Sequence, residues 1–195
     1  MKGCSIKWLL LTGLLYAWPA TAQHYKNRTL PHHVKIQYAG GIGFLSLGLG
    51  YANKKQLLEG DFYYGYLPKS VGGITIHSAT AKFTAFPIKP LQYRGLQLKP
   101  LGLGLLVNHT FGKQYFTFSP SNYFYNYYSQ PTSLNVGIFL SGQLNKKLEG
   151  KFKHIGLYYE LITFDRELLS YVNNTKSLGI LDILNLSIGI KFSRF

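Results

Sequence analysis

Apolar and polar positions alternate with a period of two along seven segments of the chain. This alternation is the pattern of a β-strand with one apolar face. The segments approach the length of about 9–11 residues that a tilted membrane-spanning strand needs. The sequence therefore predicts an all-β fold, with strands over residues 44–51, 58–66, 75–85, 101–108, 134–141, 154–161 and 184–192.

Single-chain bacterial membrane barrels have an even number of strands, so seven segments predict an eighth. Residues 34–39 supply it, because they precede Gly40 and Gly41 and can turn directly into the next segment. An alternative is an extra strand inside the aromatic stretch after His109. We expect an antiparallel up-and-down transmembrane β-barrel of eight strands over residues 34–195, preceded by a flexible segment at 23–33. If the C-terminal strand ends in the periplasm, alternation places the connections near 53–56, 87–99 and 145–153 on the periplasmic side, with 87–99 as a long turn, and the loops near 67–73, 111–132 and 165–177 on the outer side.

The alternation alone also fits an exported soluble β-sandwich. Three features favour the membrane barrel. The polar faces are rich in Gly, Ser and Asn, which suit a narrow interior, and several apolar faces end in Tyr or Phe, as the aromatic girdles of membrane barrels do. The third feature is an export signal at the start of the chain.

Residues 1–22 have the organisation of a cleaved secretory signal peptide. Two lysines precede an apolar run from Trp8 to Trp18, and Ala20 and Ala22 form the small-residue cleavage pattern. The run is shorter than the roughly 20 residues of a membrane-spanning helix. The alternative is a retained N-terminal anchor. Cys4 is the one cysteine, so the sequence excludes a disulfide framework and a cysteine metal site.

The composition combines few charged residues (14%) and many aromatic residues (16%) with a formal net charge of +14. We expect the excess of basic residues at the periplasmic rim, where they would meet lipid phosphates or an acidic periplasmic partner. Basic residues in turns of an exported chain argue against nucleic-acid binding. The predicted rim residues are Lys54, Lys55, Lys89, Arg94, Lys99, Lys146, Lys147, Lys151, Lys153, Lys191 and Arg194.

Strand parity places a small polar cluster inside the barrel. Its members are Glu59, Asp61, Lys82, Tyr158 and Glu160, with Lys191 near one end. The interior of an eight-stranded barrel is largely filled by side chains, and buried charges must be paired there. We expect Glu59 and Asp61 to lie towards Lys82 in a salt-bridge plug, whereas Glu160 has no assigned cation. The alternative is a small polar conduit or a proton-linked site.

One segment, residues 111–128, is strongly biased towards aromatic side chains. Pro120 and the flanking Asn and Ser residues predict an outer loop. Exposed Tyr and Phe are typical of binding surfaces. They can equally extend an aromatic girdle or fold over the barrel mouth. The candidate binding residues are Tyr115, Phe116, Phe118, Tyr123, Phe124, Tyr125, Tyr127 and Tyr128.

Catalysis of lipid modification would need a serine beside a histidine and an acid. His77 and Ser78 are adjacent and point to opposite faces of a strand, and Ser141 with His154 across a hairpin is the remaining pair. The other histidines lie in the N-terminal segment (His24, His32 and His33) or at a strand end (His109). We therefore expect no catalytic site, no metal and no cofactor.

The signal peptide, the alternating strands and the C-terminal Phe195 resemble the small bacterial outer-membrane barrels of the OmpA/OmpX transmembrane type. The stretches 64–73, 110–114 and 181–184 resemble an uncharacterised family of such barrels. The resemblance implies a location in the outer membrane among its lipids and lipopolysaccharide, but no activity. It also implies recognition of Phe195 by the barrel-assembly machinery, although Lys191 and Ser193 stand where that signal has apolar residues.

We accordingly expect a monomeric, non-enzymatic outer-membrane protein that is structural or binds a ligand or surface through its outer loops. The alternatives are a lipid-modifying outer-membrane enzyme, of the lipid A deacylase or acyltransferase type, and a narrow pore.

Overall fold

The computed structural model describes residues 30–116, 132–150 and 152–194. Its strands are β1 (His33–Ala39), β2 (Leu45–Ala52), β3 (Leu58–Leu67), β4 (Ile76–Ala85), β5 (Leu91–Tyr93), β6 (Leu96–Phe111), β7 (Leu134–Lys147), β8 (His154–Phe164) and β9 (Asn185–Ser193). Within these ranges three short helices connect them: α2 (Lys69–Gly72), α3 (Asp165–Asn173) and the 3₁₀-helix η1 (Ile180–Ile183). None of the helices in the described ranges is long and apolar enough to cross a bilayer.

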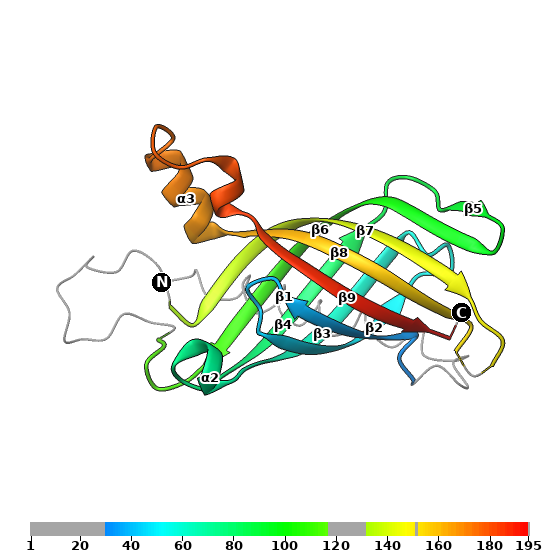
Figure 1. Ribbon diagram of the computed structural model, residues 1–195, viewed down its shortest axis with the longest axis horizontal. Helices are drawn as coiled ribbons and strands as arrows, with labels where there is room; N and C mark the ends of the chain where they lie inside the picture. The colour runs from blue at the N-terminus through cyan, green and yellow to red at the C-terminus, as the bar shows by residue number, and fades with distance from the viewer. Residues whose placement is uncertain (1–29, 117–131, 151, 195) are drawn as a thin grey trace, which may run out of the picture. The chain divides into compact units, whose positions relative to one another are not determined.

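Eight of the strands form a closed antiparallel barrel (Figure 1). Strands that follow one another along the chain pair with one another, and the pairing of β1 with β9 closes the ring. The predicted eighth strand at 34–39 is confirmed, because β1 begins at His33 and ends at Ala39. The alternative of an extra strand in the aromatic stretch concerns residues that lie mostly outside the described ranges.

The connections alternate between the two ends of the barrel. The terminal end is where β1 begins and β9 ends, and the helical end carries α2, α3 and η1 (Figure 1). The predicted connections near 53–56, 87–99 and 145–153 all lie at the terminal end, whereas those near 67–73 and 165–177 lie at the helical end. This arrangement follows from up-and-down pairing along the chain.

The connection from Pro87 to Lys99 was expected to be a long turn, and this prediction is wrong. Strand β5 pairs with the start of β6, so that the two form a hairpin which extends the barrel wall at the terminal end. Strand β6 also continues past a β-bulge between Lys99 and Gly102. The longer strand satisfies backbone hydrogen bonds that a plain turn would leave to water.

The turn from β1 to β2 folds inward at the helical end. Ala39, Gly40, Gly41 and Gly43 have φ values of 60°, 83°, 75° and 154°. Glycine adopts such values at little steric cost, which allows a sharp reversal. The reversal places Ile42 inside the barrel at 1% exposure, in an apolar cluster with Tyr63, Leu106, Phe139, Ile162 and Phe164. The hydroxyl of Ser78 donates a hydrogen bond to the carbonyl of Ile42.

Candidate functional site

The inward face of the barrel is polar and buried, whereas the outward face is apolar and exposed. The predicted strand parity is confirmed at every predicted interior residue, since Glu59, Asp61, Lys82, Tyr158 and Glu160 are between 1% and 6% exposed. The structure adds further buried polar side chains that the prediction did not assign to the interior: His33, Lys35, Gln37, Lys99 and Gln143.

Glu59 is the centre of the larger charged group. Its carboxylate accepts hydrogen bonds from the ammonium groups of Lys191 (2.5 Å), Lys99 (2.8 Å) and Lys35 (3.1 Å). The side-chain amide of Gln143 donates a fourth at 3.3 Å. These donors come from β1, β6, β7 and β9, so one carboxylate on β3 links strands from around the barrel.

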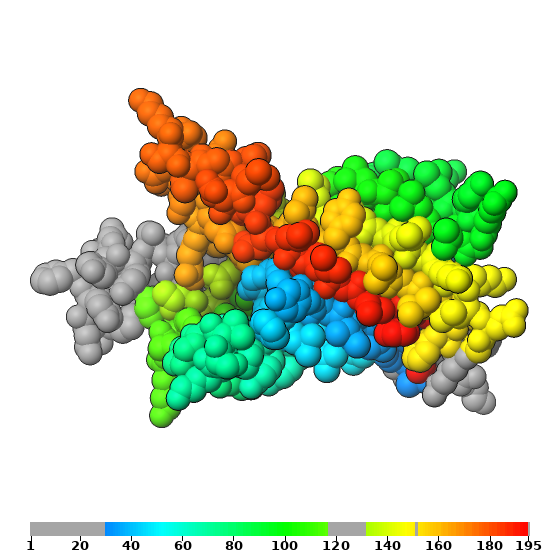
Figure 2. Space-filling view, viewed as in Figure 1, coloured from blue at the N-terminus to red at the C-terminus, as the bar shows by residue number. Residues whose placement is uncertain are grey.

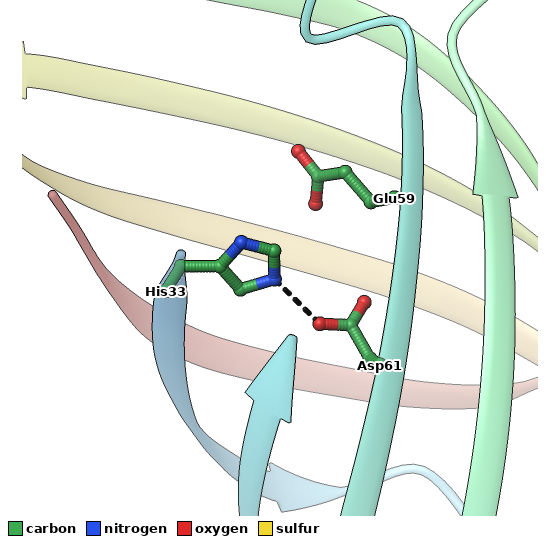
Figure 3. A group of neighbouring side chains, drawn as sticks. All are labelled: His33, Glu59 and Asp61. Atoms are coloured by element: carbon green, nitrogen blue, oxygen red, sulfur yellow. Dashed lines mark hydrogen bonds and ion pairs between the residues drawn. The ribbon is translucent and has the colours of Figure 1, made fainter. Parts of the chain in front are cut away.

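Asp61 lies two residues further along β3 and faces the same way. One of its oxygens lies 2.6 Å from Nε2 of His33, and the other accepts a hydrogen bond from Lys35 at 2.7 Å. Figure 3 shows both carboxylates projecting from the same strand towards the space beside His33. Lys35 therefore bridges Asp61 and Glu59.

A second charged group lies around Lys82 and Glu160. The ammonium of Lys82 is 2.5 Å from a carboxylate oxygen of Glu160 and 2.9 Å from the amide oxygen of Gln37. It also lies 4.5 Å from the centroid of the Tyr63 ring, a distance typical of a cation–π contact. The tyrosine hydroxyls of Tyr63 and Tyr158 are 3.2 Å apart, and Tyr158 donates to Gln37.

The expected approach of Glu59 and Asp61 to Lys82 does not extend to an ion pair between them. Lys82 stands opposite Asp61 in the β3–β4 register. Its ammonium nevertheless pairs with Glu160, which supplies the cation that had not been assigned. The carboxylates of Glu59 and Asp61 already have closer partners on β1, β6 and β9, and the long lysine side chain reaches across the narrow interior instead.

Two of the basic residues predicted at the rim lie in the interior. Lys99 and Lys191 are 2% and 4% exposed and both pair with Glu59. Lys99 faces inward because β6 continues through the segment that was expected to be a turn. Lys191 faces inward because it lies on the polar face of β9. This agrees with the strand parity, which had also placed it near one end of the interior. Lys151 and Phe195 lie outside the described residues.

His33 was expected in the flexible N-terminal segment, but β1 begins with this residue and buries it at 2% exposure. The alternation of His33, Lys35 and Gln37 with Val34, Ile36 and Tyr38 is visible in the sequence. Reading this short segment by parity would have placed all three polar residues inside. Lys99 offered no such signal, because the bulge between Lys99 and Gly102 separates it from the alternation of residues 101–108.

His33, Glu59 and Asp61 bring together three potential metal-ligand atoms within 4.8 Å. Their surroundings do not favour a cation, since Lys35, Lys99 and Lys191 already neutralise the two carboxylates. A divalent ion would have to compete with three ammonium groups that already pair with these carboxylates. The arrangement is better suited to cross-linking strands than to holding a metal.

The serine–histidine pairs considered for catalysis are not brought together. Ser141 is opposite Glu160 in the β7–β8 register, whereas His154 is opposite Lys147, six positions away and therefore about 20 Å along the strand. The Ser141 hydroxyl has no hydrogen-bond partner among the described residues. His77 accepts or donates a hydrogen bond with Tyr64 on the outward face, on the opposite side of β4 from Ser78.

The predicted aromatic binding stretch falls mostly outside the described residues. Tyr115 and Phe116 lie within them, just beyond the end of β6. The backbone carbonyl of Phe116 accepts hydrogen bonds from Thr132 and Ser133, which closes the base of this connection. Phe118, Tyr123, Phe124, Tyr125, Tyr127 and Tyr128 lie outside the described ranges.

No protein-family model, no curated protein and no solved structure matches this chain. The functional interpretation therefore depends on the geometry of the barrel itself.

Proposed function

We propose that the protein is a transmembrane β-barrel of a bacterial outer membrane, closed along its interior and non-enzymatic. The observation that carries this proposal is the outward face. It is apolar around the whole barrel, whereas the charged side chains in the middle of the strands point inward. Water-soluble proteins rarely expose a continuous apolar surface of this extent, and a bilayer is the solvent that suits it.

The outward positions of the strands illustrate this inversion. Leu47, Leu105 and Leu157 are 56%, 60% and 60% exposed, and lysine appears among these positions only at the terminal end, at Lys146. Other large outward side chains of the strands include Leu45, Leu49, Phe62, Phe83, Leu103, Val107, Val136, Ile138, Leu140, Leu186, Ile188 and Ile190.

Aromatic side chains cluster towards both ends of the outward face. At the helical end Tyr38 packs against Phe44, and His77 contacts both Tyr64 and Tyr66. At the terminal end His32 packs against Tyr51, and Phe152 against Phe192. Two such bands are expected where a membrane barrel crosses the two lipid–water interfaces.

The filled interior supports a structural or binding role and argues against the narrow pore. The apolar cluster around Ile42 occupies the interior near the helical end, and the group around Glu59 occupies it near the terminal end. An ion crossing the barrel would have to break several buried ion pairs. The separation of Ser141 from His154 likewise counts against this pair as the catalytic pair of a lipid-modifying enzyme.

The remaining elements of the proposal follow from the sequence. Residues 1–22 act as a cleaved export signal, and Phe195 is read by the barrel-assembly machinery. The barrel is a monomer that contacts outer-membrane lipids and lipopolysaccharide. Its terminal end faces the periplasm, because the two longest connections, 112–133 and 165–184, lie at the opposite end and β9 ends here. Ligands or surfaces are bound at the helical end, through the connections there and the aromatic stretch 111–128.

The direct test is folding into detergent micelles or lipid vesicles. Refolded protein should migrate differently on a denaturing gel before and after boiling, and should give a β-rich circular dichroism spectrum only when detergent or lipid is present. The same preparation in a planar bilayer should show no steady conductance. A folded monomer that is soluble without detergent would contradict the proposed membrane location. Stable single-channel currents would contradict the closed interior and support the narrow pore.

A further inference from the structure

The segment between β8 and β9 forms an arm at the helical end of the barrel. It consists of α3, η1 and the residues that join them, 174–179. Figures 1 and 2 show α3 and η1 standing off to the side of the strands rather than across the barrel mouth. The arm therefore projects away from the strands at the helical end.

The arm exposes four large apolar side chains. Leu169 and Val172 are 49% and 68% exposed, and Ile180 and Leu181 are 62% and 79% exposed. Leu169 and Val172 are three residues apart on α3, so they share a face of the helix, whereas Ser170 lies on the opposite face. Such exposure is costly in water unless another apolar phase covers it.

The direction of the arm is fixed by Glu167. Its carboxylate accepts a hydrogen bond from the backbone N–H of Phe164, the last residue of β8, at 3.0 Å. The same carboxylate accepts hydrogen bonds from the side-chain amide of Asn185, the first residue of β9, at 2.8 and 2.9 Å. One side chain thus ties the helix to both strands from which the arm departs.

An apolar groove connects the arm to the outward face. It has a volume of about 530 Å³ and reaches Leu184, the residue that joins η1 to β9. The other apolar side chains lining it include Phe83, Leu105, Ile138, Leu140 and Leu161. Leu184 therefore joins the base of the arm to an apolar surface that runs along β4, β6, β7 and β8.

The height of the apolar band places η1 near the edge of the bilayer. The nine residues of β9 rise about 3.4 Å each and, at a tilt of about 40°, cover roughly 23 Å along the barrel axis. The apolar band of membrane barrels is about 25 Å tall. The band thus ends where β9 begins, and η1 precedes β9 by a single residue.

We propose that this arm is an interfacial anchor, which inserts Leu169, Val172, Ile180 and Leu181 among the lipid acyl chains of the leaflet at the helical end. Short amphipathic elements bind at this depth, with their apolar side chains at the boundary between headgroups and acyl chains. The inference rests on the proposed membrane location of the barrel. The occupant of the apolar surface is lipid, because the surface is continuous with the outward face that lipid already covers.

Tryptophan fluorescence tests this inference directly. The chain has two tryptophans, Trp8 and Trp18, which Trp8→Phe and Trp18→Phe remove from the full-length protein. Leu181→Trp then places one probe on the arm. Leu105→Trp on the outward face of β6 is the control for membrane insertion, and Ser170→Trp on the opposite face of α3 is the control for water. Each variant is folded into phosphatidylcholine vesicles with brominated acyl chains, and folding is checked by gel migration.

Brominated chains should quench Leu181→Trp to at least about half the extent of Leu105→Trp and about threefold more than Ser170→Trp. Equal, weak quenching of Leu181→Trp and Ser170→Trp, with strong quenching of Leu105→Trp, would overturn the anchor and leave the proposed membrane barrel intact. A folded Leu105→Trp protein that is not quenched would overturn both.

Discussion

At the scale of single residues, the stability of the barrel interior depends most on Glu59. This carboxylate accepts hydrogen bonds from three lysines, and the described interior holds four buried lysines against three buried carboxylates. Buried ions are expensive to leave without a partner, far more so than ions at a surface. The loss of one carboxylate here affects three cations at once.

The variant Glu59→Gln keeps the size of the side chain and removes its charge. We expect it to lower the free energy of unfolding by about 3–5 kcal/mol, the range for breaking a buried ion pair. Urea unfolding in vesicles, followed by tyrosine fluorescence or gel migration, measures this change. Glu149→Gln is the matched control, because Glu149 is exposed in the β7–β8 connection and should change stability by less than about 0.5 kcal/mol. Equal effects of the two substitutions would show that the cluster around Glu59 contributes nothing specific.

The sequence predicted which side chains enter the interior better than it predicted how they pair. Parity along β3, β4 and β8 correctly placed Glu59, Lys82 and Glu160 inside. The pairing of Lys82 with Glu160 joins residues that are 78 positions apart in the chain. It depends on the stagger of all eight strands and on how far a lysine reaches across the barrel. The alternation of residues within one segment gives no information on the stagger between strands or on the reach of a side chain.

At the scale of the elements, glycines on the inward face make room for the aromatic rings that fill the barrel. Gly48 on β2 is directly opposite Tyr63 on β3. A Cβ atom at Gly48 would lie 2.6 Å from Cε1 and 2.7 Å from Cδ1 of the Tyr63 ring, which is fully buried. The ring can lie flat across the neighbouring strand only because that position has no side chain.

The variant Gly48→Ala should therefore destabilise the barrel by about 1–3 kcal/mol, the usual cost of overfilling a packed core. Gly60→Ala is the matched control, since Gly60 lies on the adjacent strand and a Cβ atom added there would have no described neighbour within 4 Å. Thermal or urea unfolding of the two variants in the same detergent measures the difference. A Gly60→Ala variant as unstable as Gly48→Ala would point to strand propensity rather than ring packing.

The strands of the barrel were predictable because alternation of apolar and polar residues is a local property of the sequence. The two elements that the sequence did not predict, β5 and α3, show no such alternation. Strand β5 has three residues, and its pairing with β6 is visible only once β6 is known to begin at Leu96. Helix α3 has nine residues within a segment predicted to be a connection. Its direction depends on the contact of Glu167 with Asn185, which no pattern within the helix predicts.

At the scale of the whole molecule, charge is distributed unevenly between the two ends. The terminal end carries Lys54, Lys55, Lys89, Arg94, Lys146, Lys147, Lys153 and Arg194, and the one acidic residue in its described connections is Glu149. At the helical end, Asp165, Glu167 and Asp182 offset Lys69, Lys113, Arg166 and Lys176. The large positive charge of the chain is thus concentrated at the end that we assign to the periplasm.

This asymmetry predicts a dependence of stability on lipid charge. Each lysine near an anionic surface contributes about 1 kcal/mol at most, and salt screens the attraction within roughly 10 Å at 0.1 M. We expect the barrel to unfold at a higher temperature in vesicles that contain phosphatidylglycerol than in pure phosphatidylcholine, and this increase should shrink as salt is added. The buried ion pairs around Glu59 are shielded from salt, so the stability in phosphatidylcholine should change little.

Replacing Lys54, Lys55, Lys146 and Lys147 by glutamine should abolish most of the increase, because these four residues lie in connections and strand ends at the terminal end. Replacing Lys69, Lys113 and Lys176 at the helical end is the control. It should leave most of the increase unchanged, because Asp165, Glu167 and Asp182 offset the basic residues at that end. An equal loss from the two sets would mean that the lipid responds to total charge rather than to this end. If neither set of substitutions changes the increase in unfolding temperature, the basic residues of the terminal end do not bind lipid phosphates. An acidic periplasmic protein is then the partner that the charge of this end fits best.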